Sequence, residues 1–350
     1  MRLAPFFAGL RRVRRTVLCA VGAAAALACP AQAQTALRMS LDWRFEGPAA
    51  PFTMALDKGY FKAEGLEVTI DTAAGSREPV ARVGSGVYDI GFGDVNTLVR
   101  FRDENPDNDV RAVMVLYDRP PFAIVGRKSR GLTGEVASLR GKSFGAPAGD
   151  AAFAQWPIFK AAHGIDEGEW KMRFESIGFP VREPMLAQGE VDAVFGFAMT
   201  SYINLRSRGV PADDIVVMHM REHGLELYGN VIMVSEKFLA EKPEAVRGFL
   251  RALVRGLRDT IDDPPAAVDT VLTRNDVARK DVELDRLRMV LEQNILTPWV
   301  KENGVGGIDR ARFERALDQI GLAFPYRQKP KVDDVFDERF LPPASDRKMN

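Results

Sequence analysis

Hydrophobic and polar positions follow two alternating patterns along residues 34–235. Short apolar or β-branched runs, typical of strands, alternate with segments that have apolar residues at helical spacing. The predicted strands are 37–41, 67–72, 90–93, 110–117, 122–126, 143–146, 172–176, 193–196, 215–218 and 231–235. The predicted helices are 51–58, 77–85, 94–105, 150–162 and 200–208. Strands separated by helices indicate an α/β fold with mostly parallel sheets and helices on both faces.

The pattern changes after Gly229, where helices predominate. Apolar residues recur at helical spacing in 246–257, again in 268–272, and finally in 313–320. These three stripes predict helices that pack one face on a core. The polar, proline-containing segment 326–350 is predicted to be a C-terminal tail on the surface.

One short pattern occurs twice. Residues 86–93 and 189–196 share G-x-x-D-x-x-F-G, and each copy follows a segment that begins Arg-Glu-Pro, which we take as the start of a helix. The pattern describes a helix stopped by Gly, a turn held by Asp, and a short strand that ends in Gly. A terminal Gly lets another group approach the backbone, and ligands of open α/β sheets bind at the carboxyl ends of strands. The two copies therefore predict two sheets whose equivalent edges face one cleft.

The first 33 residues have the layout of a secretory signal peptide. A region with five arginines is followed by the apolar run 16–29 and by Ala31-Gln32-Ala33. We expect export to the periplasm with cleavage after Ala33. Paired arginines leave both general and twin-arginine export open. Lipid attachment at Cys29 is less favoured because Pro30 follows it.

Removal of this segment changes the composition. It contains both cysteines and five of the 48 basic residues, but none of the 48 acidic residues. The remaining chain carries a net charge of about −5, which gives no reason to bind nucleic acid. It has no cysteine for a disulfide or a thiolate nucleophile. We expect no cofactor and no metal.

Several segments resemble one large family. They are Asp42-Trp43 after the first strand, the stretch Lys58-Gly59-Tyr60-Phe61 with Glu64-Gly65-Leu66-Glu67-Val68, and Leu139-Arg140-Gly141-Lys142. These segments are similar to periplasmic substrate-binding proteins of ABC importers for nitrate, sulfonates, taurine and thiamine-type pyrimidines. The resemblance extends over residues 36–325.

The resemblance implies a two-lobed periplasmic-binding-protein clamp of the class II type with two hinge crossings. Lobe one would comprise 34–120 and 230–325, and lobe two 121–229. The protein would act as a monomer, close around a small molecule without altering it, and deliver it to an inner-membrane permease with its ATPase. The ligand we expect first is an aromatic or heteroaromatic compound such as a thiamine-precursor pyrimidine. A sulfonate, taurine or an aromatic carboxylate comes second.

The candidate ligand-binding residues follow predicted strands or border the crossings. Trp43 could stack on a planar ring, and Arg44 could pair an acidic group. Helix N-termini at Gly75-Ser76 and Gly149-Asp150 offer free N–H groups, although Asp150 would suit an amine better than an anion. The further candidates are Asp94, Phe197, Thr200, Tyr202, Tyr228 and Asn230.

Two enzyme alternatives stay open. His219-Met220-Arg221-Glu222-His223 matches the H-x-x-E-H motif of inverted zinc peptidases, which needs both histidines one turn apart on a helix. A strand-like segment precedes the motif and Gly224 follows it, so a helix is not expected there. The resemblance also includes a fungal pyrimidine-synthesis enzyme of the same fold. That enzyme relies on a cysteine-rich segment, which residues 34–350 lack.

Overall fold

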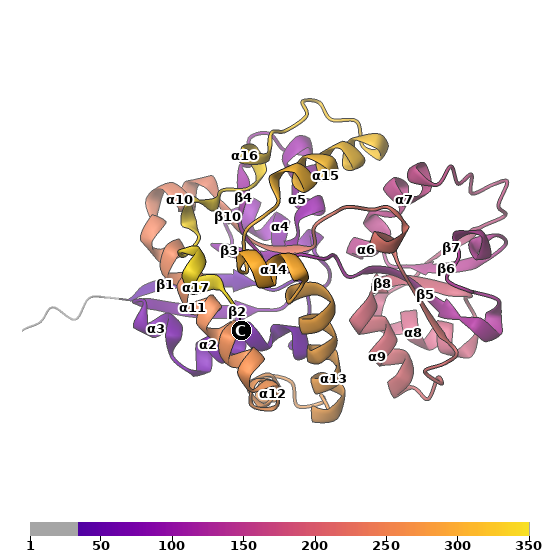
Figure 1. Ribbon diagram of the computed structural model, residues 1–350, viewed down its shortest axis with the longest axis horizontal. Helices are drawn as coiled ribbons and strands as arrows, with labels where there is room; N and C mark the ends of the chain where they lie inside the picture. The colour runs from indigo at the N-terminus through magenta and orange to yellow at the C-terminus, as the bar shows by residue number, and fades with distance from the viewer. Residues whose placement is uncertain (1–33, 350) are drawn as a thin grey trace, which may run out of the picture. The chain divides into compact units, whose positions relative to one another are not determined.

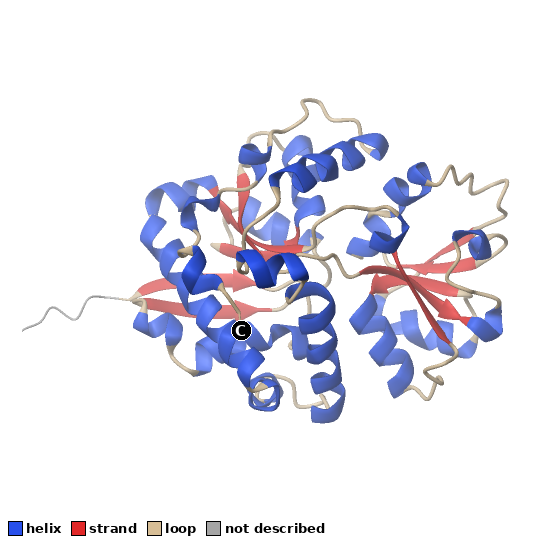
Figure 2. Ribbon diagram, viewed as in Figure 1, coloured by secondary structure: helices blue, strands red, loops and turns tan. Residues whose placement is uncertain are grey.

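The computed structural model describes residues 34–349 and places them in two five-stranded mixed sheets, each with helices packed on it (Figures 1 and 2). The predicted signal peptide, its cleavage site and the lipid-attachment alternative at Cys29 lie outside the described residues. The α/β, two-lobed fold class expected from the sequence is confirmed.

The first sheet has the strand order β2-β1-β3-β10-β4. Its strands are β1 (Thr35–Ser40), β2 (Leu66–Asp71), β3 (Ile90–Asp94), β4 (Val110–Val115) and β10 (Asn230–Ser235). β1 pairs in parallel with β2 and β3, whereas β10 runs antiparallel to β3 and β4. Four of the five strands therefore point the same way, as a mostly parallel sheet requires.

The second sheet repeats this arrangement in the order β7-β6-β8-β5-β9. Its strands are β5 (Phe122–Arg127), β6 (Ser143–Ala146), β7 (Arg173–Ser176), β8 (Ala193–Phe197) and β9 (Ile215–His219). Here β5 is the antiparallel strand, between β8 and β9. The two copies of the repeated pattern end in β3 and β8, which are the middle strands of their sheets. The copies therefore occupy equivalent positions, as predicted.

The chain passes from the first sheet to the second between β4 and β5, and returns between β9 and β10. The two crossings are joined by a hydrogen bond from the Gly229 amide to the Tyr117 carbonyl, at 3.0 Å. A Cβ at Gly229 would lie 2.8 Å from the Cβ of Tyr117. Only glycine permits so close an approach of the two segments.

The helices that follow the strands differ in detail from the prediction. Those of the first 210 residues are α2 (Ala50–Asp57), α3 (Tyr60–Ala63), α4 (Arg77–Gly84), α5 (Val95–Glu104), α6 (Ala151–Ala154), α7 (Trp156–Ala162), α8 (Phe179–Gln188) and α9 (Ala198–Ser207). The predicted helix 150–162 is divided at Gln155. The Arg-Glu-Pro of the second repeat does not begin its helix, because α8 starts at Phe179 and contains Pro184. Shorter 3₁₀ turns are η1 (Gly47–Ala49), η2 (Lys128–Arg130), η3 (Val136–Leu139) and η4 (Met220–His223).

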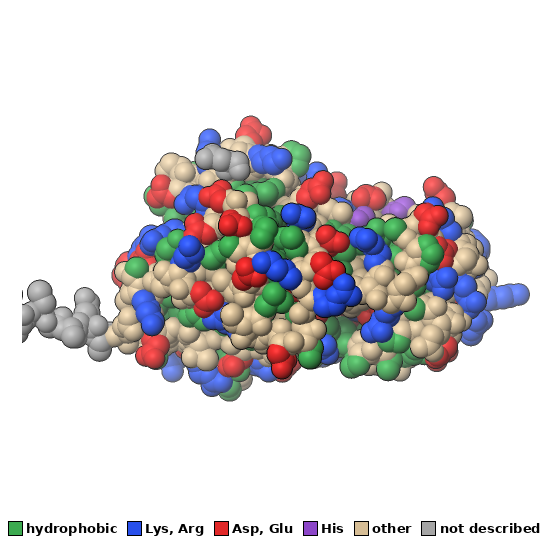
Figure 3. All heavy atoms as spheres, turned by 90° about the horizontal axis from the view of Figure 1, so that it is seen from below, with side chains coloured by type: hydrophobic (Ala, Val, Ile, Leu, Met, Phe, Trp, Pro, Cys, Tyr) green, Lys and Arg blue, Asp and Glu red, His purple; other side chains and the backbone are tan. Residues whose placement is uncertain are grey.

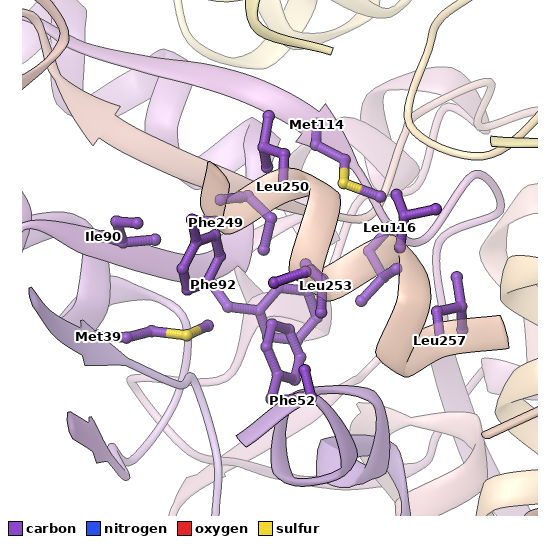
Figure 4. Close-up of a cluster of buried hydrophobic side chains, with 14 of the residues drawn as sticks. Met39, Phe52, Ile90, Phe92, Met114, Leu116, Phe249, Leu250, Leu253 and Leu257 are labelled. Atoms are coloured by element: carbon purple, nitrogen blue, oxygen red, sulfur yellow. The ribbon is translucent and has the colours of Figure 1, made fainter. Parts of the chain in front are cut away.

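The C-terminal part is helical, as its apolar stripes predict. It contains α10 (Glu236–Glu241), α11 (Pro243–Asp262), α12 (Pro264–Leu272), α13 (Lys280–Val290), the π-turn η5 (Leu291–Ile295), α14 (Pro298–Asn303), α15 (Arg310–Ala323), α16 (Val332–Val335), η6 (Glu338–Phe340) and α17 (Ala344–Arg347). We call the part of the described chain built around the first sheet the first half, and the part built around the second sheet the second half. Figure 4 shows the apolar stripe of α11 packed in the core of the first half. The labelled residues are Met39, Phe52, Ile90, Phe92, Met114, Leu116, Phe249, Leu250, Leu253 and Leu257.

The segment 326–350 is predicted as a surface tail, but residues 326–349 are partly buried. Val335, Phe336 and Phe340 are all less than a tenth exposed. Phe336 also forms a parallel bridge with Ala112 of β4. The prediction was wrong because prolines and charged residues dominate the composition of this segment. Its few apolar residues cover the edge of the first sheet at β4.

The described surface mixes acidic and basic side chains (Figure 3). Within residues 34–349, none of the helices is both long enough and apolar enough to cross a membrane.

Candidate functional site

A cavity lies between the two halves. It encloses about 610 Å³ of empty space, part of it open to solvent. The first half contributes the loop after β1, the start of α4, and residues Phe92 and Tyr117. The second half contributes the starts of α6, α8 and α9. The loop and the helix starts follow strands β1, β2, β6, β7 and β8, and so lie at the carboxyl ends of these strands, where ligands of open α/β sheets bind.

The cavity brings together part of the predicted set. The candidates that line it are Trp43, Arg44, Gly75, Ser76, Asp150, Phe197 and Thr200. The candidates that do not line it are Asp94, Gly149, Tyr202, Tyr228 and Asn230. Sequence reasoning missed six polar or aromatic lining residues, which are Asp42, Glu46, Phe92, Tyr117, Phe179 and Arg182.

Two aromatic side chains meet at the cavity from opposite halves. The rings of Trp43 and Phe179 are 4.8 Å apart between centroids and inclined at 66°. Trp43 follows β1, whereas Phe179 begins α8. The indole Nε1 of Trp43 is buried and has no hydrogen-bond partner among the described residues. A planar molecule packed beside this edge-to-face pair would find apolar ring surfaces and one indole N–H donor.

Asp42 places a buried carboxyl at the same wall. Its Oδ2 accepts hydrogen bonds from Asn230 Nδ2 at 2.6 Å and from Ser76 Oγ at 3.3 Å. Burial raises the pKa of Asp42 to about 6, although both hydrogen bonds oppose the rise. Asn230 thus supports a lining residue from behind. The Asp-Trp pair at 42–43 was the signal that could have identified Asp42.

At the predicted anion site at the start of α4, two backbone N–H groups already donate hydrogen bonds to other residues of the protein. The Gly75 amide donates to the Asp42 carbonyl at 2.9 Å, and the Ala74 amide donates to Glu78 at 2.8 Å. The Asp42 carboxylate stands beside Ser76. An anion there would face the Asp42 carboxylate, which opposes its binding.

A buried ionic network forms the opposite wall. Arg182 contacts Asp150 Oδ2 and Glu183 Oε1, both at 2.7 Å, and all three side chains are at most 5 % exposed. Asp150 also caps α6 by accepting from the amides of Ala152 and Phe153. The two carboxylates neutralise Arg182. Asp150 is therefore a structural anchor of this wall as well as a lining residue.

The remaining candidates have structural partners. Asp94 caps α5 through the amides of Asn96 and Thr97, and it accepts from Gln155 Nε2 of the second half at 3.1 Å. The buried hydroxyl of Tyr228 accepts from the Asp309 amide at 2.8 Å. Tyr202 packs among the apolar residues of the second half.

The backbones of the two halves touch at Gly75 and Gly149. Gly75 has φ +95°, and a Cβ built on it would lie 2.2 Å from the carbonyl oxygen of Gly149. Gly149 does not line the cavity but closes it at this point. The described conformation is therefore closed at one edge of the cleft.

The H-x-x-E-H alternative lacks its helix. His219 ends strand β9, and His223 ends the 3₁₀ turn η4. Arg221 donates to Nδ1 of His219 at 3.0 Å, and burial lowers the pKa of His219 to about 3. The two imidazoles are not arranged one turn apart on an α-helix, as the zinc motif requires.

Comparisons with known proteins agree with the observed fold. The fold matches that of the alkanesulfonate-binding protein SsuA from Xanthomonas axonopodis pv. citri, with a TM-score of 0.64, 14% identity, and coverage of 88% of this chain and 98% of that one. The fold is thus that of periplasmic binding proteins. The sequence matches the family described as NMT1/THI5 like over residues 48–267, and the chain belongs to this family.

Curated relatives include both binding proteins and enzymes. The riboflavin-binding protein RibY of Chloroflexus aurantiacus is 29% identical over 85% of this chain and 83% of its own length. The formylaminopyrimidine-binding protein of Halalkalibacterium halodurans is 24% identical over 87% and 90%. A 4-amino-5-hydroxymethyl-2-methylpyrimidine phosphate synthase of Aspergillus parasiticus is 27% identical over 65% and 67%.

Proposed function

We propose that this protein is the extracytoplasmic solute-binding component of an ABC import system, and that it captures a planar, uncharged heteroaromatic compound. The observation that carries the proposal is the pair Trp43 and Phe179, which reach one cavity from two halves of the chain. A flat ring in the cavity, packed beside this edge-to-face pair, would contact both halves at once. Such a ligand stabilises the closed form because it binds that form better than the open one.

The charges around the cavity favour a neutral ligand over a sulfonate or nitrate. Asp42 and Glu46 line it, and Arg182 is already paired with two carboxylates. Arg44 is an exposed lining residue whose guanidinium lies 5.4 Å from the Trp43 ring centroid. An anion would therefore meet two carboxylates and one solvated cation. The names of the riboflavin- and formylaminopyrimidine-binding relatives support the same class of ligand.

We further propose that the protein binds without catalysis. Among the described residues, the cavity lining includes no His, Lys or Cys. Residues 34–350 also lack cysteine, whereas the fungal enzyme of the same fold relies on a cysteine-rich segment. The synthase relatives make pyrimidine synthesis the second candidate. Conversion of a bound pyrimidine, followed by mass spectrometry, would favour that alternative.

The cellular setting completes the proposal. The predicted signal peptide would export the chain to the periplasm, with cleavage after Ala33. Residues 34–120 with 230–325, and residues 121–229, would act as the two lobes of a hinged monomer. The loaded clamp would dock on a permease in the inner membrane.

A thermal-shift panel tests the proposal directly. Riboflavin, formylaminopyrimidine, taurine and ethanesulfonate are added to the purified protein, since specific binding raises the melting temperature by mass action. We expect at least one of the two heteroaromatic compounds to stabilise the protein and both sulfonates to leave it unchanged. Stabilisation by a sulfonate alone would refute the proposed ligand class.

A further inference from the structure

Glu46 is a cavity residue with an incomplete set of partners. It lies between Trp43 and the turn η1, and its side chain is 14 % exposed. Its Oε2 is buried and accepts no hydrogen bond from the described residues. Burial raises the pKa of Glu46, and the nearby Glu283 carboxylate adds to the rise, whereas Arg286 and the indole N–H of Trp43 oppose it. A buried carboxylate oxygen without a donor is costly unless a further group supplies one.

Arg286 holds this carboxylate from behind. Its side chain is 2 % exposed, and its Nε lies 3.4 Å from Glu46 Oε2 and 3.1 Å from Glu283 Oε2. Glu283 also accepts the Gly47 amide at 2.7 Å. The loop that carries Glu46 is thereby fixed to α13. One guanidinium faces two carboxylates, so the cluster has room for another donor.

The other side of the same guanidinium reaches the second half. Its terminal nitrogens donate to Asn204 Oδ1 at 3.1 Å and to the Thr200 carbonyl at 3.4 Å. Both acceptors belong to α9, and Thr200 itself lines the cavity. Arg286 therefore joins the loop of Glu46 to the opposite wall.

We propose that Glu46 accepts a hydrogen bond from an N–H group on the edge of the bound solute, and that Arg286 couples this hydrogen bond to closure through α9. The proposal rests on the proposed function and specifies its ligand further. Trp43 lines the same cavity, and its buried Nε1–H lies beside the Glu46 carboxylate without a hydrogen bond of regular geometry to the described residues. The solute would thus carry an acceptor and an N–H donor on one edge, as a cyclic imide or an amino-substituted nitrogen heterocycle does.

The test uses riboflavin, whose ring imide has such an edge, and 3-methylriboflavin, in which a methyl group replaces the imide hydrogen. Flavin fluorescence is titrated with the wild-type chain and with Glu46→Gln, Glu46→Leu, Asn204→Ala and Glu236→Gln. Glu236 is a matched control, because its Oε2 is also buried without a hydrogen bond and close to an arginine, but it does not line the cavity. Circular dichroism melting confirms that each variant is folded.

The wild-type protein is expected to bind riboflavin about tenfold or more tightly than 3-methylriboflavin, as loss of a hydrogen bond to a charged group predicts. Glu46→Leu should weaken riboflavin binding by a similar factor and abolish the preference. Glu46→Gln should weaken it less, and Glu236→Gln should change nothing. Asn204→Ala should speed dissociation about threefold or more in stopped-flow measurements, while association stays unchanged.

The outcomes distinguish an incorrect ligand from an incorrect role of Glu46 or of α9. If the wild-type protein binds neither flavin, a flavin ligand is refuted, and this inference is refuted with it. If the wild-type protein binds riboflavin but Glu46→Leu keeps both the affinity and the preference, the role of Glu46 alone is wrong. If Asn204→Ala dissociates at the wild-type rate, the coupling through α9 is wrong.

Discussion

The close approach of Gly75 and Gly149 gives a sharp test of closure. An alanine at position 75 would place its Cβ 2.2 Å from the Gly149 carbonyl oxygen. Because a Cβ cannot lie so close to an oxygen atom, the two backbones would have to move apart by about 1 Å. Overpacking of this kind costs about 1–3 kcal/mol. The φ of +95° adds about 1–2 kcal/mol of backbone strain for alanine. The first cost falls on the closed form alone, whereas the second falls on the folded chain in both forms.

Only the steric cost should weaken ligand binding. Because apparent affinity falls with the population of the competent state, about 1–3 kcal/mol corresponds to about a 5- to 150-fold weaker dissociation constant. Gly86→Ala is the matched control, because Gly86 has φ +73° and nothing within 4 Å of an added Cβ. It should lower the melting temperature but leave the affinity unchanged.

Calorimetric titration of both variants with the strongest ligand of the panel measures the two effects. A Gly75→Ala protein that binds as tightly as the wild type would show that closure at this edge is not needed. Equal losses in both variants would attribute the effect to backbone strain, and the steric argument would fail.

Three further changes test the account at other points. Trp43→Ala should weaken binding of a planar ligand about 5- to 150-fold, because stacking on an aromatic side chain contributes about 1–3 kcal/mol. Tyr202→Ala, outside the cavity, should have no effect on the same titration. Equal binding by Trp43→Ala would refute stacking. Phe249→Ala should lower the free energy of unfolding by about 3–5 kcal/mol in urea titrations, because Phe249 is fully buried in the core of the first half; a loss below about 1 kcal/mol would contradict that packing. The pKa of Asp42 is raised to about 6 when folded, so its protonated form favours folding below pH 4 and this contribution disappears as the pH rises through 6. Asp42→Asn should therefore gain about 1–3 kcal/mol relative to the wild type between pH 4 and pH 8, and a constant difference across that range would show that Asp42 has an ordinary pKa.

The sequence predicts the elements well because each has a local signal. The strand at 143–146 is found at the expected residues, and Asp94 caps the helix after β3 as its position indicates. The repeated G-x-x-D-x-x-F-G correctly anticipates two equivalent middle strands. These features depend on a few neighbouring residues, so a pattern along the chain is sufficient.

The site is less predictable because its residues gain their roles from distant partners. Tyr228 is a candidate because it borders the second crossing, yet its hydroxyl accepts a hydrogen bond from the Asp309 amide, 81 residues away. Glu46 has no local motif, and its position depends on Glu283 and Arg286 of α13. Arg182 begins the Arg-Glu-Pro segment before the second repeat, but only the fold places it in the cavity wall beside Asp150. The tail after Pro325 was misjudged for the same reason, because β4 supplies the surface that buries Phe336.

Calorimetric titration of the purified protein with riboflavin, formylaminopyrimidine and ethanesulfonate tests the central claim most directly. We expect saturable one-to-one binding of at least one heteroaromatic compound, with a negative heat-capacity change from burial of its apolar faces, and no binding of the sulfonate. Saturable binding of ethanesulfonate with no binding of either heteroaromatic compound would contradict the account.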